Sequence, residues 1–160
     1  MKRVSRRWTI GAVLAVLLSA VAYKTLFPNG TPPSGKDQVK SQEARQQAAK
    51  FIEYYRSISL TAEQEKVKNE ALTAIPAPCC RGYSIATCCC PCNLAKAAWG
   101  LSHFLIANKG YGVQQVREEV QRWISSTNRD GYAGNACYIE HCNQPFEKDG
   151  CGGMDERQVL

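Results

Sequence analysis

The sequence has few histidines and lacks the motifs of several common enzyme classes. Only two histidines, His103 and His141, occur among its 160 residues, and no H-E-x-x-H pattern is present. There is also no glycine-rich phosphate-binding loop and no recognisable serine triad. The chain therefore carries no motif of the zinc proteases, the P-loop nucleotide-binding proteins or the serine hydrolases.

Beyond the N-terminus, positive and negative charges nearly balance. Four of the net +6 charges come from the first seven residues, at Lys2, Arg3, Arg6 and Arg7, which leaves +2 for the chain beyond residue 22. Acidic and basic residues are interspersed there, without the basic patch that nucleic-acid binding requires. We therefore expect no nucleic-acid partner and attribute the N-terminal basic residues to targeting.

Long apolar runs are limited to one, which excludes a polytopic membrane protein. This run covers residues 8–23, follows the basic residues and contains an A-x-A pattern at Ala20–Ala22. The arrangement is typical of an export signal cleaved after Ala22, or of an uncleaved N-terminal membrane anchor. Both alternatives place the rest of the chain outside the cytoplasm, on the periplasmic or cell-surface side.

The rest of the chain has the apolar periodicity of an all-α fold, a small helical bundle. Helical spacing is found in residues 37–56, 61–74, 93–108 and 113–125. Thr61 and Gln64 form a capping-box sequence, and Gly110 stands where a glycine ends a helix. The third segment is apolar on two sides, which predicts that it is central, and His103 within it is expected to be a core or interface histidine rather than a metal ligand.

These patterns divide the chain into four parts. Residues 1–23 are the export signal or anchor, and residues 24–36 are a linker rich in proline and glycine. Residues 37–127 form the helical bundle, with a cysteine-rich loop between two of its helices. Residues 128–160 have no clear period and form an irregular, cysteine-rich C-terminal segment.

No cysteine occurs in the first 78 residues, but nine follow. Thiolates crowded together are what a soft ion requires, because Cu(I), Zn(II), Hg(II) and iron–sulfur clusters take several sulfur ligands at about 2.3 Å. We favour copper, zinc or mercury over an iron–sulfur cluster. The first cluster predicts the main metal ligands: Cys79, Cys80, Cys88, Cys89, Cys90 and Cys92.

A second cluster in the C-terminal segment predicts a further or completing set of ligands. Cysteine, histidine and thioether together favour Cu(I) or another soft ion over calcium or magnesium. The alternative is that its three cysteines are disulfide partners and its methionine is a surface residue. The members of this cluster are Cys137, His141, Cys142, Cys151 and Met154.

Structural disulfides are the simplest alternative to metal binding, and an exported location permits them. Nine is an odd number, so at least one thiol would remain. The first cluster places six cysteines within fourteen residues, and bridges at such spacing close little loop and add little stability. A disulfide-stabilised interaction domain therefore stands behind metal binding.

The motif Cys89-x-x-Cys92 stands directly before a helix that begins Asn93-Leu94-Ala95. Together with Lys109-Gly110-Tyr111 and the helical segment that follows, about 35 residues in all, it resembles the haem-handling thiol oxidoreductases of cytochrome c maturation. Those proteins are small exported three-helix bundles that reduce apocytochrome cysteines. The resemblance implies that Cys89 and Cys92 are a redox pair, one attacking and the other resolving the mixed disulfide. Four cysteines have no counterpart in that family: Cys79, Cys80, Cys88 and Cys90.

The sequence thus favours an extracytoplasmic protein that binds and handles a soft metal, copper or mercury, through clustered thiolates. A partner protein would receive the metal, and an uncleaved N-terminal segment would contact the membrane. Thiol–disulfide oxidoreduction by Cys89 and Cys92 is the alternative activity, with a redox partner protein.

Overall fold

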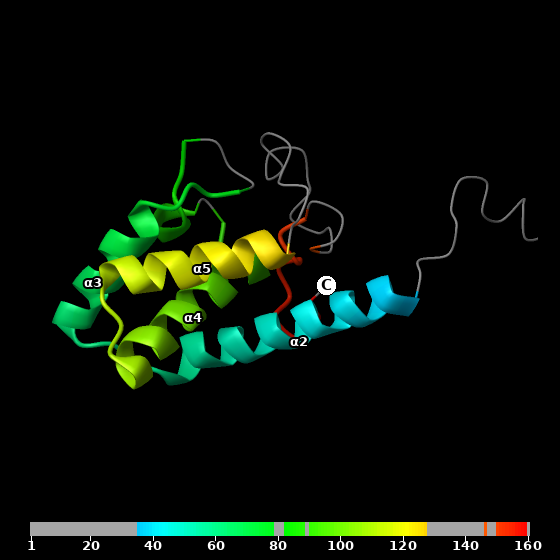
Figure 1. The fold of residues 1–160 in the computed structure, drawn as a ribbon, viewed down its shortest axis with the longest axis horizontal. Coiled ribbons are helices and arrows are strands. Elements are labelled where there is room, and N and C mark those ends of the chain that lie inside the picture. The colour runs from blue at the N-terminus through cyan, green and yellow to red at the C-terminus, as the bar shows by residue number, and fades with distance from the viewer. Residues whose placement is uncertain (1–34, 79–81, 89, 128–145, 147–149, 160) are drawn as a thin grey trace, which may run out of the picture. The chain divides into compact units, whose positions relative to one another are not determined.

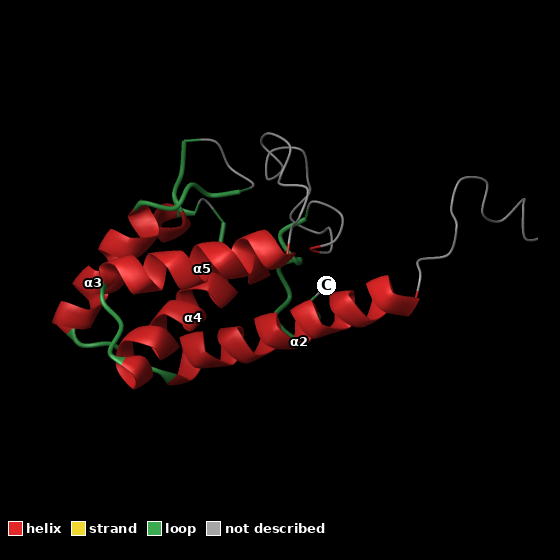
Figure 2. Ribbon diagram, in the orientation of Figure 1, coloured by secondary structure: helices red, strands yellow, loops and turns green. Residues whose placement is uncertain are grey.

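The computed structural model describes residues 35–78, 82–88, 90–127, 146 and 150–159. Contacts divide the chain into two units, Met1–Asp37 and Gln38–Leu160, and the helices that surround the cysteines belong to the second. The described residues are helical, without strands, as the sequence predicts (Figures 1 and 2). The elements are α2 (Gly35–Ser57), α3 (Ala62–Thr73), the short 3₁₀ helix η1 (Ile85–Thr87), α4 (Asn93–Lys109) and α5 (Val113–Thr127).

The predicted helix ends are confirmed by their capping contacts. The side chain of Thr61 accepts a hydrogen bond from the Gln64 amide and the Gln64 side chain accepts one from the Thr61 amide, which completes the capping box of α3. Gly110 ends α4 with a left-handed backbone, φ 67°, a conformation that costs glycine little. The sequence therefore contains the local signals that set these two ends.

Helix α4 is the central element, as its two apolar sides predict. Most of its side chains are buried, and it contacts α3, α5 and η1. Helix α2 packs so closely on α4 that a β-carbon at Gly100 would lie 1.7 Å from the carbonyl oxygen of Phe51. In Figure 1 α4 passes between α2 and α5, so its N-terminal turn is held from several sides.

Aromatic rings fill the contacts between α2 and its neighbours. Phe51 meets Trp123 of α5 edge-on with ring centroids 5.5 Å apart, and Tyr54 stacks on Phe104 of α4 at 4.8 Å. Such pairs add to the free energy gained by burying apolar area. They fix the position of α4, on whose first turn the cysteine loop depends.

A short segment near the C-terminus, residues 150–156, lies across the N-terminal turn of α4, and we call it the strap. Within it, Cys151 and the adjacent Gly150, Gly152 and Gly153 are all buried. Phe146, also buried, packs its ring against Trp123. The strap contains no helix, which agrees with the irregular C-terminal segment that the sequence predicts.

The export signal or anchor and most of the linker lie outside the described residues, so the four-part division of the chain stays a prediction. Among the helices that the structure describes, none combines the length and the apolar character needed to cross a membrane.

Candidate metal centre

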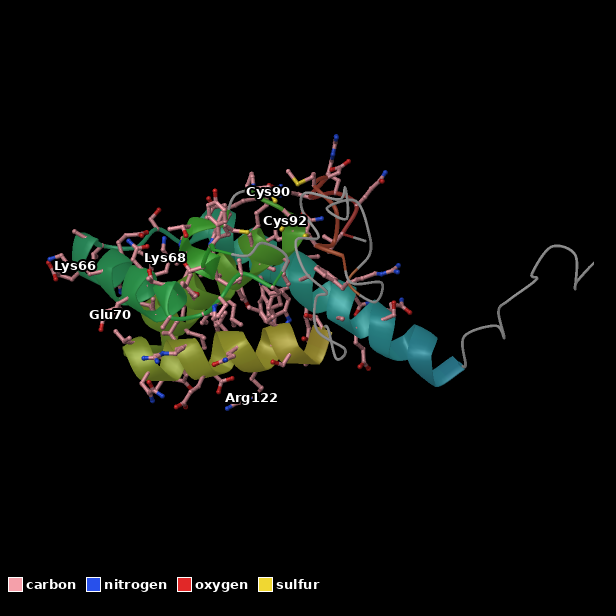
Figure 3. All side chains as sticks on the ribbon, turned by 90° about the horizontal axis from the view of Figure 1, so that it is seen from above. Lys66, Lys68, Glu70, Cys90, Cys92 and Arg122 are labelled. Atoms are coloured by element: carbon pink, nitrogen blue, oxygen red, sulfur yellow. The ribbon has the colours of Figure 1, made fainter. Side chains whose placement is uncertain are left out.

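Three cysteines of the first cluster come together before α4. The sulfur atoms of Cys88, Cys90 and Cys92 all lie within 4.8 Å of one another, in the region shown in Figure 3. Sulfur atoms that share one ion at about 2.3 Å lie about 4 Å apart. The three side chains are therefore close enough to hold one metal ion with small adjustments of their rotamers.

The backbone explains why these three sulfur atoms converge. Cys88 ends η1 with φ −50° and ψ 130°, and Cys92 precedes α4 with φ −70° and ψ 169°. Both pairs of angles are extended conformations, so neither cysteine lies within the helix beside it. The Cys92 amide also donates to the Cys90 carbonyl at 2.9 Å, a tight turn whose central residue, Pro91, has the φ value that such a turn needs.

The loop before the cysteines is fastened to the rest of the bundle. An isolated antiparallel bridge joins Pro76 to Ser84, and the Ile85 amide donates to the Ile75 carbonyl at 2.9 Å. The indole nitrogen of Trp99 in α4 donates to the Ile85 carbonyl at 2.8 Å. Cys88 therefore starts from a fixed point on α4, and the three sulfur atoms do not depend on the loop alone for their grouping.

Cys92 is the N-cap residue of α4, but its side chain makes no capping hydrogen bond. The first two helix amides instead donate to the strap, Asn93 to the Gly153 carbonyl and Leu94 to the Cys151 carbonyl, both at 2.9 Å. The first amides of a helix have no acceptor within the helix, so the strap supplies it. The sulfur of Cys92 therefore does not cap the helix, and it lies at the positive end of a helix dipole that favours thiolate.

Asn93 ties the strap to α4 a second time. Its side chain is fully buried, and its amide nitrogen donates to the Gly152 carbonyl at 2.6 Å and to the Asp155 carbonyl at 3.1 Å. Gly152 has φ 72°, and a β-carbon there would lie 2.4 Å from the ring of Phe146. Only glycine fits this position without displacement of the ring.

A buried charge lies one helical turn after Cys92. Lys96 donates to a carboxylate oxygen of Glu156 at 2.8 Å and to the Met154 carbonyl at 3.2 Å, and Glu156 also pairs with Arg56 of α2. Burial lowers the pKa of Lys96, and the negative charge of a Cys92 thiolate acts in the opposite direction. Lys96 is thus a cation close enough to Cys92 to stabilise its thiolate electrostatically.

The other predicted ligands are distributed differently. Cys151 is buried in the same apolar core as Cys92, but it is not one of the three grouped sulfur atoms. Met154 is 41% exposed and contributes its carbonyl to Lys96 rather than its sulfur. Six predicted ligands lie outside the described residues: Cys79, Cys80, Cys89, Cys137, His141 and Cys142.

His103 is a core histidine, as the sequence predicts. Its ring is buried, and Nδ1 lies 2.8 Å from the Ile58 carbonyl, which makes Nδ1 the protonated nitrogen. Burial lowers the pKa of His103, and the hydrogen bond to Ile58 opposes that effect. It does not join the cysteine group among the residues that the structure describes.

Sequence reasoning missed Asn93, Lys96 and Glu156, which hold the strap beside the cysteines. The three grouped sulfur atoms belong to the first cluster, which the sequence predicts as metal ligands, and they follow a C-x-C-x-C spacing. Cys89 of the C-x-x-C motif lies outside the described residues. That alternation is itself a signal in the sequence. Asn93, Lys96 and Glu156 carry no such signal, because their roles depend on contacts far apart in the chain.

Comparison with known proteins adds no relative from which a role can be taken. The chain matches no protein-family model, no curated protein and no solved structure. The chemistry of the site must therefore be argued from its own residues.

Proposed function

We propose that this protein binds a soft metal ion through the thiolates of Cys88, Cys90 and Cys92. The observation that carries the proposal is the mutual distance of the three sulfur atoms, within 4.8 Å. Cys92 is not needed as a capping side chain, since strap carbonyls accept the first amides of α4. Binding of one ion by three thiolates would explain why the three sulfur atoms lie together.

The ligand set favours Cu(I) or Hg(II). Thiolate sulfur is a soft donor that selects soft ions over magnesium, calcium or manganese. Structural zinc sites take four protein ligands, whereas three sulfur atoms come together among the described residues, a number that Cu(I) and Hg(II) accept. Copper or mercury handling is therefore the role that we propose, with zinc as the competitor to be tested.

The exposure of the three cysteines suits transfer of the ion to a partner protein. Cys92 is fully buried, whereas Cys88 and Cys90 are half-buried. A partner thiolate could replace the half-buried ligands one at a time while Cys92 still holds the ion. The N-terminal basic and apolar segments support delivery outside the cytoplasm, where we propose that the protein acts.

Metal content of anaerobically purified protein tests the proposal. We expect about one equivalent of a soft metal. Cys92→Ser should remove the metal or lower the affinity for it by about 100-fold. Met154→Leu, which changes an exposed sulfur on the strap, should leave the metal content unchanged. Less than one equivalent of any soft metal, after exposure to Cu(I), Hg(II) and Zn(II) in turn, would contradict the proposal.

A second candidate is thiol–disulfide oxidoreduction by Cys89 and Cys92. The position of Cys92 at the start of α4, with Lys96 one turn away, favours it, because both stabilise a thiolate. In that role one thiolate attacks a substrate disulfide and the other thiol resolves the mixed disulfide. Insulin reduction separates the two functions, because Cys89→Ser should abolish reductase activity but leave metal bound to the three described cysteines.

A further inference from the structure

The strap and the cysteine group meet at the first turn of α4. Cys92 stands immediately before the two residues whose amides donate to the strap, Asn93 and Leu94. Its own carbonyl is an acceptor of the same helix, for the Lys96 amide at 3.0 Å. A change that orders or unwinds this turn therefore affects both Cys92 and the hydrogen bonds to the strap.

From this arrangement we infer that the strap and the metal site are coupled: metal binding stabilises the contacts between the strap and α4, and these contacts strengthen metal binding. The inference rests on the proposed function, since it requires an ion held by Cys92. Its physical basis is preorganisation. An ion shared with Cys88 and Cys90 would fix the position of Cys92. The next two amides, which donate hydrogen bonds to the strap carbonyls, would then be held in the direction of their acceptors.

The reverse effect follows from the same contacts. A closed strap holds the first turn helical and places Cys92 where the other two sulfur atoms lie, so less conformational entropy is lost when the ion binds. Thermodynamic linkage requires the two effects to be equal: the factor by which the strap raises metal affinity is the factor by which metal stabilises strap closure. This equality makes the inference quantitative.

Gly152→Ala is the substitution that opens the strap without changing charge. The new β-carbon would meet the Phe146 ring at 2.4 Å and would also strain a backbone with φ 72°. Gly110→Ala is the matched control, because φ is 67° there and no atom lies within 4 Å of the added carbon. The control carries the same kind of backbone strain at the other end of α4, away from the strap.

Hydrogen exchange at the Asn93 and Leu94 amides measures strap closure directly, because their acceptors are strap carbonyls. We expect one equivalent of Cu(I), added anaerobically, to slow exchange at both amides on the order of 10-fold. Gly152→Ala should abolish this slowing and lower Cu(I) affinity, measured by chelator competition, by the same factor. Gly110→Ala should leave Cu(I) affinity and the slowing at wild-type values.

If Gly152→Ala does not fold, Asn93→Ala takes its place, since it removes two hydrogen bonds to the strap without altering charge. Its matched control is Asn108→Ala at the exposed end of α4. Wild-type protein that binds Cu(I) with unchanged or faster exchange at Asn93 and Leu94 would overturn the strap inference alone. Wild-type protein that binds no soft metal would overturn the proposed function as well.

Discussion

At its C-terminal end α4 is closed by the residues that follow it directly, whereas at its N-terminal end it is closed by residues 59 positions later in the chain. The Gly110 amide donates to the Ile106 carbonyl and the Tyr111 amide to the Leu105 carbonyl, both at 3.1 Å. At the other end, backbone carbonyls of the strap accept the first amides. The second arrangement needs more of the chain, but it leaves the Cys92 side chain outside the capping contacts.

The two ends of α4 differ in whether neighbouring residues or a distant segment satisfy the terminal hydrogen bonds. Serine, threonine, aspartate and asparagine usually end a helix on this side by turning their side chain back onto its amides. The side chain of Cys92 does not do so, and its sulfur lies within 4.8 Å of those of Cys88 and Cys90. At this end of α4 the strap carbonyls accept the first helix amides, and the Cys92 side chain does not take part in the cap.

The largest expected effect comes from breaking the middle of α4, on which both ends depend. Gly100→Ala should lower the free energy of unfolding by about 3 kcal/mol, because the added carbon would overlap the Phe51 carbonyl of α2. Chemical denaturation measures the change. Gly112→Ala, with no atom within 4 Å, is the control, and equal stability of the two variants would show that α2 and α4 are not in such close contact.

Removal of the long-range cap comes next. Asn93→Ala should lower the free energy of unfolding by about 2 kcal/mol, about 1 kcal/mol for each side-chain hydrogen bond lost to the strap. Asn108→Ala, near the locally closed end, should change it by less than about 0.5 kcal/mol. Similar values for the two variants in thermal unfolding would mean that the strap contributes nothing to the N-terminal end.

Changing the C-terminal cap of α4 at Gly110 should have a smaller effect, and it should change stability but not metal affinity. Gly110→Ala should cost about 1 kcal/mol, because alanine is strained at φ 67°. Metal affinity should stay at the wild-type value, since this end lies away from the cysteines. A loss of metal binding by Gly110→Ala, seen in chelator competition, would mean that the two ends are not independent.

The smallest expected effect is a dependence of stability on pH that arises between the two ends, at His103. Burial holds its pKa below the ordinary value of 6.5 in the folded state, so the unfolded chain takes up a proton first as the pH falls. The free energy of unfolding should therefore decrease as the pH falls below about 6.5 and level off once the folded state is protonated too. Denaturation at a series of pH values measures the slope, which His103→Gln should reduce; an unchanged slope would assign it to other groups.

The sequence predicted what local signals encode. The periodicity of residues 113–125 and the capping pair Thr61 and Gln64 predicted α5 and the start of α3, because both depend on neighbours within a few positions. Gly110 predicted the end of α4 for the same reason.

The strap could not be predicted from local signals. The glycines near Cys151 and the side chain of Asn93 contact one another only because segments far apart in the sequence pack together. The grouping of Cys88, Cys90 and Cys92 depends in part on the tight turn between Cys90 and Cys92, which helical periodicity does not reveal. The ion pair between Lys96 and Glu156 likewise joins positions whose spacing carries no pattern. Local rules therefore located the cysteine loop, and tertiary contacts determine which thiols face one another.

X-ray absorption of the protein loaded with one equivalent of Cu(I) tests the central claim most directly. We predict a coordination shell of three sulfur atoms at about 2.3 Å, reduced by one sulfur in Cys92→Ser and unchanged in Met154→Leu. A shell made of nitrogen or oxygen, or a sulfur shell that Cys92→Ser leaves intact, would contradict the assignment of the metal to Cys88, Cys90 and Cys92.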